Sequence, residues 1–223
     1  MKFETKYLIR WGIPGWVLIF WVFYGILFVK GINPLENNLA EISKGFTLLI
    51  SLAAIGVPIG YILHQFYFGV IWVKNMKHDF NDAAEKVGDK FPKHSDWLEL
   101  NDQNYKQNKK VNPHGNYYQF EYVWHSVLLK MNSETRTYVE GRYRHILGTI
   151  HGLGALGASS ALSMVASAVI FGTDFSNHSL LAYIFLIIGI IIQIIIFVSA
   201  IYNYKYFSDN LRAFQIKMLK TYL

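Results

Sequence analysis

Four long apolar stretches, none of which contains Asp, Glu, Lys or Arg, dominate the pattern of side chains along this chain. They cover residues 11–29, 46–73, 147–173 and 179–204. Each is long enough to cross a bilayer as a helix, because roughly 20 residues at a rise of about 1.5 Å span the hydrocarbon core. The pattern therefore predicts an all-α fold, a polytopic membrane protein with four transmembrane helices.

The polar stretch between the second and third spans keeps a helical spacing of apolar residues next to both membrane helices. Helix two is expected to continue to about Lys86, after which Gly88 and Pro92 end it. Residues 101–116 are dense in Asn, Gln and Lys, which indicates an exposed, mobile loop. The pattern thus predicts that helices two and three extend into a cytoplasmic helical hairpin.

A further apolar stripe at three- and four-residue steps begins after Tyr117 and predicts an amphipathic helix. Asn132 and Ser133 offer a break and an N-cap before a second helix, which runs from Glu134 into span three. Because the apolar face needs a partner to cover it, its residues are candidates for partner binding. They are Phe120, Trp124, Val127 and Met131. On the second helix Arg136, Glu140 and Arg144 recur every fourth residue and predict ion pairs.

The tail after Tyr204 is predicted to restart as a separate amphipathic helix, capped by Ser208 and Asp209. Its apolar and basic faces carry Leu211, Phe214, Met218, Leu219 and Tyr222 opposite Arg212, Lys217 and Lys220. Such a helix beside a membrane either lies on the anionic inner leaflet or packs on the hairpin. The pattern does not separate these two alternatives.

These elements divide the chain into four segments. Residues 1–73 hold an N-terminal cytoplasmic segment and transmembrane helices one and two, and residues 74–146 form a cytoplasmic helical module. Residues 147–204 hold transmembrane helices three and four, and residues 205–223 form a cytoplasmic amphipathic tail.

The distribution of basic residues predicts the orientation in the membrane. Of the 21 Lys and Arg, three precede the first span, twelve lie between spans two and three, and four follow the last span. Positive residues are retained in the cytoplasm during insertion, so both termini and the middle segment are expected inside, in an inner (cytoplasmic) membrane. The net charge of +6 is then a topology signal, and we expect no nucleic-acid partner.

Several kinds of chemistry are excluded or not expected. The chain has no cysteine, which excludes disulfides, thiolate metal ligands and a catalytic thiol. No nucleotide-binding, metalloprotease or serine-hydrolase motif occurs in the sequence, so we predict no catalytic residues, no metal and no cofactor. The spans hold no carboxylate for a proton relay, so a proton-coupled pump is not expected either.

Span two carries a proline between two glycines at its middle, namely Gly56, Pro58 and Gly60. A proline removes a backbone hydrogen bond and kinks a helix, so this segment is a candidate hinge. The alternative is a fixed bend that fits the helix bundle, because membrane helices tolerate proline and glycine.

The strongly polar side chains inside the spans are few: His64, Gln65, His151 and Gln193. Polar groups at this depth face water or another helix, so a cross-helix contact is expected for at least one of them. A buried interhelical hydrogen bond is the simpler interpretation, and His64 and His151 are placed at depths that allow contact.

Span three is unusually rich in small residues at four-residue steps. The main positions are Gly148, Gly152, Gly154, Gly157, Ser159, Ser163 and Ser167. Small surfaces let helix backbones approach closely in lipid. They predict either tight packing within one protomer or an oligomer interface or narrow pore, and the sequence weighs the two equally.

Together these features favour a non-enzymatic, homo-oligomeric inner-membrane protein, channel-like or signal-responsive, that is controlled through its cytoplasmic helical module. An alternative is a membrane anchor or adaptor for a cytoplasmic partner, for example in a bacterial defence or toxin-immunity system. A second alternative is an integral-membrane lipid-modifying enzyme that uses His145, His151 or the pair His78 and Asp82. The expected partners are membrane lipid, further copies of the chain and a cytoplasmic protein.

Overall fold

The described part of the chain is helical and contains no strand. The computed structural model describes residues 5–29, 39–72, 85–91, 115–172 and 180–223. Its elements are α1 (Thr5–Val29), α2 (Leu39–Tyr67), the π-helix η1 (Phe68–Trp72), α6 (Gly115–Lys130), α7 (Ser133–Gly172) and α8 (Leu180–Tyr222). The all-α prediction is confirmed for these residues.

Four of the helices are long and apolar enough to cross a membrane. They are α1, α2 with η1, α7 and α8, in the order that the apolar stretches predict. The share of buried residues is 44% in the apolar part of α7 but only 17% in the apolar part of α8. Because the exposed remainder of these helices is apolar, the chain is a membrane-embedded helical protein.

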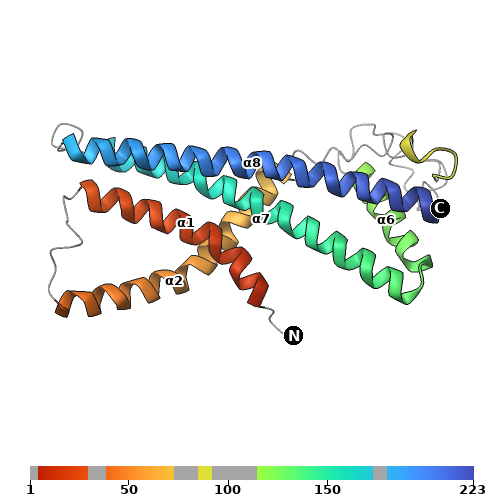
Figure 1. Cartoon of the computed structure of the whole chain (residues 1–223), viewed down its shortest axis with the longest axis horizontal. Coiled ribbons are helices and arrows are strands. Elements are labelled where there is room, and N and C mark those ends of the chain that lie inside the picture. Colours follow the sequence, from red (N-terminus) through yellow and green to blue (C-terminus); the bar gives the residue numbers. More distant parts are fainter. Residues whose placement is uncertain (1–4, 30–38, 73–84, 92–114, 173–179) are drawn as a thin grey trace. The chain divides into compact units, whose positions relative to one another are not determined.

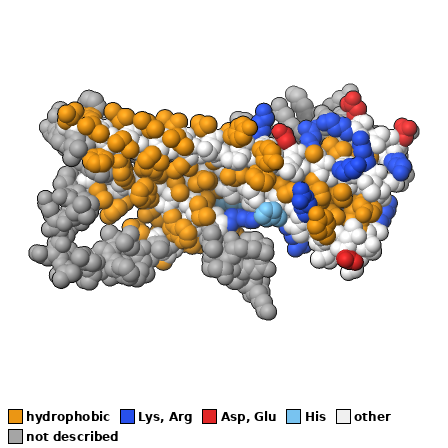
Figure 2. Space-filling view, viewed as in Figure 1, with side chains coloured by type: hydrophobic (Ala, Val, Ile, Leu, Met, Phe, Trp, Pro, Cys, Tyr) orange, Lys and Arg blue, Asp and Glu red, His pale blue; other side chains and the backbone are white. Residues whose placement is uncertain are grey.

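The chain forms two compact units. Unit 1 contains Met1–Val70 and Thr149–Lys205, and unit 2 contains Ile71–Gly148 and Tyr206–Leu223. Both α7 and α8 therefore have residues in each unit without a helix break. Figure 2 shows hydrophobic side chains over the surface of unit 1, while Lys and Arg side chains gather over unit 2.

In unit 1, α1 and α2 cross at a contact made of glycines (Figure 1). A Cβ atom added to Gly15 would collide with the backbone of Gly56, and one added to Gly60 would collide with the backbone of Trp11. The two backbones therefore touch at this crossing. This is the close approach that small residues permit between helices in lipid.

The helix α7 is buried in unit 1 along a row of serines: Ser159, Ser160, Ser163 and Ser167. The Ser159 hydroxyl donates to the carbonyl of Pro14 on α1, and the Ser160 hydroxyl donates to the carbonyl of Gln193 on α8, at 2.8 Å. Hydroxyls on a small-residue face thus join three helices through backbone acceptors, which keeps these polar groups satisfied away from water.

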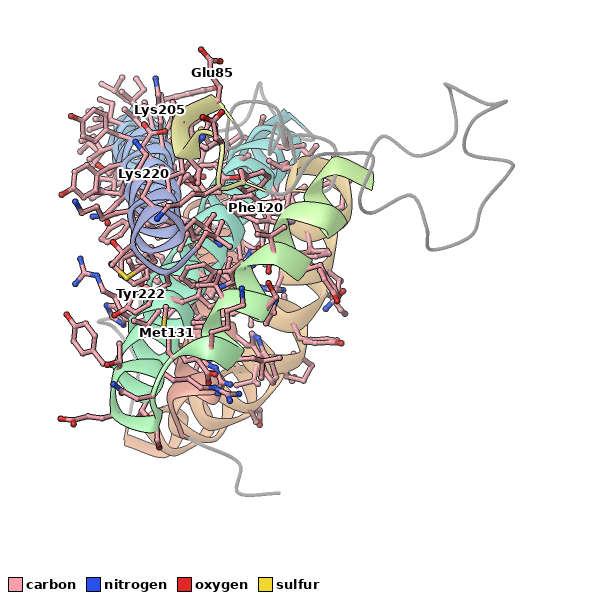
Figure 3. The ribbon with its side chains drawn as sticks, turned by 90° about the vertical axis from the view of Figure 1, so that its right-hand side faces the viewer. Glu85, Phe120, Met131, Lys205, Lys220 and Tyr222 are labelled. Atoms are coloured by element: carbon pink, nitrogen blue, oxygen red, sulfur yellow. The ribbon has the colours of Figure 1, made fainter. Side chains whose placement is uncertain are left out.

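The core of unit 2 lies between α6, α7 and the end of α8. Phe120 and Met131, both labelled in Figure 3, belong to this core. Its buried members are Phe91, Phe120, Val123, Trp124, Val127, Leu128, Met131, Val139 and Leu219. Phe91 enters the core after a helical turn that ends at Gly88, whose φ of +84° suits glycine. The sequence pattern predicted a stop at Gly88 for an extension of helix two, most of which lies outside the described residues.

The break between α6 and α7 falls where it was predicted. Asn132 lies between the two helices, and its side-chain Oδ1 accepts a hydrogen bond from the Thr135 backbone N–H at 2.8 Å. The predicted ion pairs are also present, since Glu140 contacts Arg136 at 2.7 Å and Arg144 at 3.4 Å. The hydrogen bond from Arg136 holds the pKa of the Glu140 carboxyl below its usual value.

The prediction of a separate helix in the tail is wrong. α8 runs without interruption through Ser208 and Asp209 to Tyr222, so neither residue is an N-cap. No Gly or Pro occurs in that stretch to end the helix, and Ser and Asp cost little inside it. Leu211 and Leu219 are buried and Leu219 belongs to the core of unit 2, so the tail packs on the chain itself.

Some predictions concern residues outside the described part of the chain. They are the extension of helix two over residues 73–84, the loop over residues 101–114 and the pair His78 and Asp82. The last two residues of the predicted loop, 115 and 116, belong to α6.

Candidate functional site

The two intramembrane histidines lie against each other in unit 1. The ring centroids of His64 on α2 and His151 on α7 are 5.7 Å apart, and the rings meet edge to face. His64 follows the glycine crossing at Gly60 by one helical turn. His151 precedes Gly154, where the ring of Tyr67 occupies the space that a side chain would need. The positions of the glycines thus bring the imidazoles of two helices together.

Aromatic side chains enclose this pair. Tyr67 is fully buried, and its ring centroid lies 6.0 Å from that of His151 and 6.1 Å from that of Tyr204 on α8. The ring of Phe68 lies 5.7 Å from His151. We call His64, Tyr67, His151 and Tyr204 the histidine–tyrosine cluster. It joins three of the four membrane helices.

The remaining membrane helix, α1, contributes a charge. The guanidinium of Arg10 on α1 lies near enough to interact electrostatically with both imidazoles, and its side chain reaches Gly152 on α7. A proton on either histidine would add a second positive charge beside Arg10, and like charges repel strongly where water is scarce.

The chemistry available to the cluster is proton exchange and hydrogen bonding. Imidazole takes up a proton near neutral pH more readily than any other side chain present there. Within the described ranges, no group of three or more His, Asp or Glu side chains converges as a metal-binding set.

Of the other intramembrane polar residues, Gln193 is buried away from the cluster and Gln65 is exposed. Gln193 is buried on α8, and its amide N–H donates to the Ser167 hydroxyl of α7 at 3.2 Å. Gln65 is exposed on α2. The sequence predicted a cross-helix contact for at least one of these polar groups, and Gln193 and His64 both have one.

The predicted hinge residues have a packing role in the structure. Gly56 and Gly60 are buried where α2 crosses α1, while Pro58 is exposed between them. α2 continues as one helix through Pro58, and the departure from regular α-helix comes later, at η1. Movement at this segment stays a prediction.

The small residues predicted for packing or an oligomer interface are buried, with the exception of Gly152. The serines Ser159, Ser163 and Ser167 are buried inside a single chain, as are the glycines Gly148, Gly154 and Gly157. Gly152 is half-buried beside Arg10. This face is therefore used for packing within one protomer. The exposed side of α7 carries Leu162, Val165 and Val169 instead.

The predicted partner-binding face needs a correction. Phe120, Trp124, Val127 and Met131 are buried, the last at 8% exposure, and they pack against α7, α8 and Phe91. The chain covers this face itself, because the end of α8 supplies the apolar partner that the helix pattern required. These four side chains therefore belong to the core of unit 2, and a cytoplasmic partner stays a prediction.

Two polar residues of unit 2, Glu121 and Gln215, were not singled out from the sequence. The Tyr143 hydroxyl donates to Glu121 at 3.1 Å, and the buried amide of Gln215 on α8 faces the same carboxylate. Burial raises the pKa of Glu121, although Tyr143, His125 and Gln215 act in the opposite direction. Gln215 could have been noticed, since it lies one turn from both Leu211 and Leu219 on the apolar face of the tail.

Comparison with known protein families, curated proteins and solved structures found no match for this chain.

Proposed function

We propose that this protein is a non-enzymatic, homo-oligomeric, signal-responsive membrane effector of channel-like type in the inner (cytoplasmic) membrane. Unit 2 would receive a signal in the cytoplasm, and α7 and α8 would carry the change into the membrane helices. Both termini would lie in the cytoplasm, as the distribution of Lys and Arg favours.

The continuity of α7 and α8 is the observation that carries this proposal. Each of these helices has residues in both units, and neither helix is interrupted where it passes from one unit to the other. A shift in the packing of unit 2 must therefore be absorbed by helices that also hold the serine row and the histidine–tyrosine cluster. Packed helices switch between discrete arrangements rather than deform continuously, which suits a responsive protein.

The exposed apolar surface supports association with further copies or with lipid. The ridge of α8 includes Ile187, Ile191, Ile194, Ile195 and Val198, all exposed in the single chain. This ridge and the outer side of α7 are therefore candidate surfaces for a homo-oligomer, as are the exposed apolar side chains of α1 and α2.

The absence of cysteine permits a direct test. Tyr202 on α8 is 75% exposed, so Tyr202→Cys can carry one spin label per chain without disturbing the core. In proteoliposomes a single label yields a dipolar distance only between protomers. We expect a defined distance whose modulation depth falls on dilution with unlabelled chain.

The response of the membrane helices is tested by a substitution that weakens the core of unit 2 and so replaces the unknown signal. Trp124→Ala removes a fully buried ring, and Tyr122→Ala is the matched control, because Tyr122 is exposed on the same helix. We expect Trp124→Ala, but not Tyr122→Ala, to change both the distance at position 202 and ion flux from the liposomes. If the labels show no distance between protomers and the liposomes stay tight with both variants, the proposal fails.

A further inference from the structure

A cavity of about 460 Å³ lies in unit 2 beside the end of α8. Its lining comes from one face of α8 and from Lys86 in the short segment next to it, and Figure 3 shows Lys220 on α8 beside that segment, which also carries Glu85. The lining residues are Lys86, Asp209, Arg212, Ala213, Ile216, Lys217 and Lys220. We call this the basic cavity. Its volume falls within the range of ligand sites, about 300–1,000 Å³, and it is open to solvent, since five of its seven lining residues are exposed.

The charges of the basic cavity are strongly unbalanced. Four lining side chains are cationic and one, Asp209, is a carboxylate, an excess of three formal positive charges. On α8 the positions follow one another at three- and four-residue steps, so their side chains project from the same face. The C-terminal end of α8, which is the negative end of its dipole, lies nearby and stabilises these cationic side chains. The dipole does not itself attract an anion, so the attraction for an anion comes from the side chains.

The combination of one arginine with three lysines indicates the class of ligand. A guanidinium offers two parallel N–H donors that match two oxygens of a phosphate, and ammonium groups add point charges around it. A phosphate-bearing group presents more oxygens to these donors than a single carboxylate does, so it can engage the guanidinium and the ammonium groups together. Ala213 and Ile216 give the cavity an apolar wall, which suits a compact molecule.

We propose that the basic cavity binds a phosphate-bearing anion, and that this anion is the signal received by unit 2. The second part rests on the proposed function, while the binding itself does not. Two sources share this chemistry, namely a soluble phosphorylated molecule and the headgroup of an anionic phospholipid.

The test uses the full chain in phosphatidylcholine nanodiscs, titrated with inorganic pyrophosphate by calorimetry. Lys217→Gln combined with Lys220→Gln removes two lining charges, and we expect binding at least about tenfold weaker, because hydrogen bonds to charged groups are among the strong ones. The matched control is Lys90→Gln combined with Lys130→Gln, which removes the same charge from exposed positions outside the cavity. The control should bind as the unchanged protein does.

Asp209→Asn makes the result independent of folding. Removing the one carboxylate of the lining should tighten pyrophosphate binding about threefold, on the scale of surface charge interactions. A variant that merely damages the fold cannot bind more tightly.

The lipid source is tested in nanodiscs of equal parts phosphatidylcholine and phosphatidylglycerol, with the lipids retained per chain counted by native mass spectrometry. Retained phosphatidylglycerol that is lost in the Lys217/Lys220 variant but kept in the Lys90/Lys130 variant assigns the cavity to a headgroup. Pyrophosphate binding with the same pattern assigns it to a soluble ligand. If neither probe binds, or if the two double variants behave alike, the inference is overturned.

The readout separates this inference from the proposed function. If pyrophosphate or phosphatidylglycerol binds in the expected pattern but the spin-label distance at position 202 does not change, the cavity stands and its role as a signal receiver fails. If Trp124→Ala changes that distance while neither probe binds, the proposed function stands and the binding inference fails.

Discussion

The crossing of α1 and α2 makes a prediction whose sign can be worked out in advance. At Gly60 the atoms that a new Cβ would meet are the carbonyl of Trp11 and the backbone of Gly15. Backbone atoms cannot rotate away as a side chain can, so Gly60→Ala must push the two helices apart. Extra atoms in a packed interior cost about 1–3 kcal/mol.

An opposing effect has to be subtracted. Alanine is favoured over glycine in a helix interior by about 1 kcal/mol. The net loss in the free energy of unfolding for Gly60→Ala is therefore expected to be up to about 2 kcal/mol. Gly69 and Gly141 have open space where a Cβ would be, so alanine at either position should stabilise by about 0.5–1 kcal/mol.

The assay is reversible unfolding in mixed dodecylmaltoside and SDS micelles, followed by far-UV circular dichroism. The combined variant Gly15→Ala with Gly60→Ala should lose less than the two single losses added together, because both act on one contact. If Gly60→Ala is stabilised by as much as Gly69→Ala, the close approach is wrong. If stability is unchanged but the response in liposomes is lost, the glycine serves as a hinge instead.

Three further predictions concern single side chains. Asn132→Ala should destabilise unit 2 by about 0.5–2 kcal/mol through loss of the α7 cap, and Asn132→Asp should not, as measured by thermal unfolding. Because burial raises the pKa of Glu121 above its unfolded value of 4.5, the stability linked to this group is fully present below that value and is lost as the pH rises through the folded pKa. Glu121→Gln should therefore flatten the decline in unfolding midpoint between pH 4 and neutral pH, and an unchanged profile would contradict the assignment. Gln193→Leu should cost about 0.6 kcal/mol, at most roughly 1.7, by loss of the bond to Ser167, and a larger cost would indicate a role beyond this hydrogen bond.

The number, order and type of the long helices could be predicted because length and hydropathy report directly on transfer into lipid. The break at Asn132 was also readable, since a capping side chain and the end of an apolar stripe coincide there. The tail was misread because Ser208 and Asp209 resemble caps. Caps stabilise a helix end only where the backbone leaves the helix, and here tertiary packing of Leu211 and Leu219 continues it.

The composition of the histidine–tyrosine cluster was only partly accessible from the chain. The two histidines stand out because polar groups in a span are rare. Tyr67 and Tyr204 do not, since tyrosine is frequent in this sequence and common near membrane interfaces. Arg10 was counted as an orientation signal, and its proximity to both imidazoles could not be read from the sequence.

The sequence by itself determined that this protein is helical and membrane-embedded, and it restricted the positions at which backbones could come close. Hydropathy measures how much a residue gains by leaving water, so it defines spans and apolar faces. It cannot name the neighbour of a face, because many apolar surfaces satisfy that requirement equally. The tertiary structure decided that the serine row packs within the protomer, that α8 covers the apolar face of α6, and that two histidines meet, since these depend on shape and hydrogen-bond geometry.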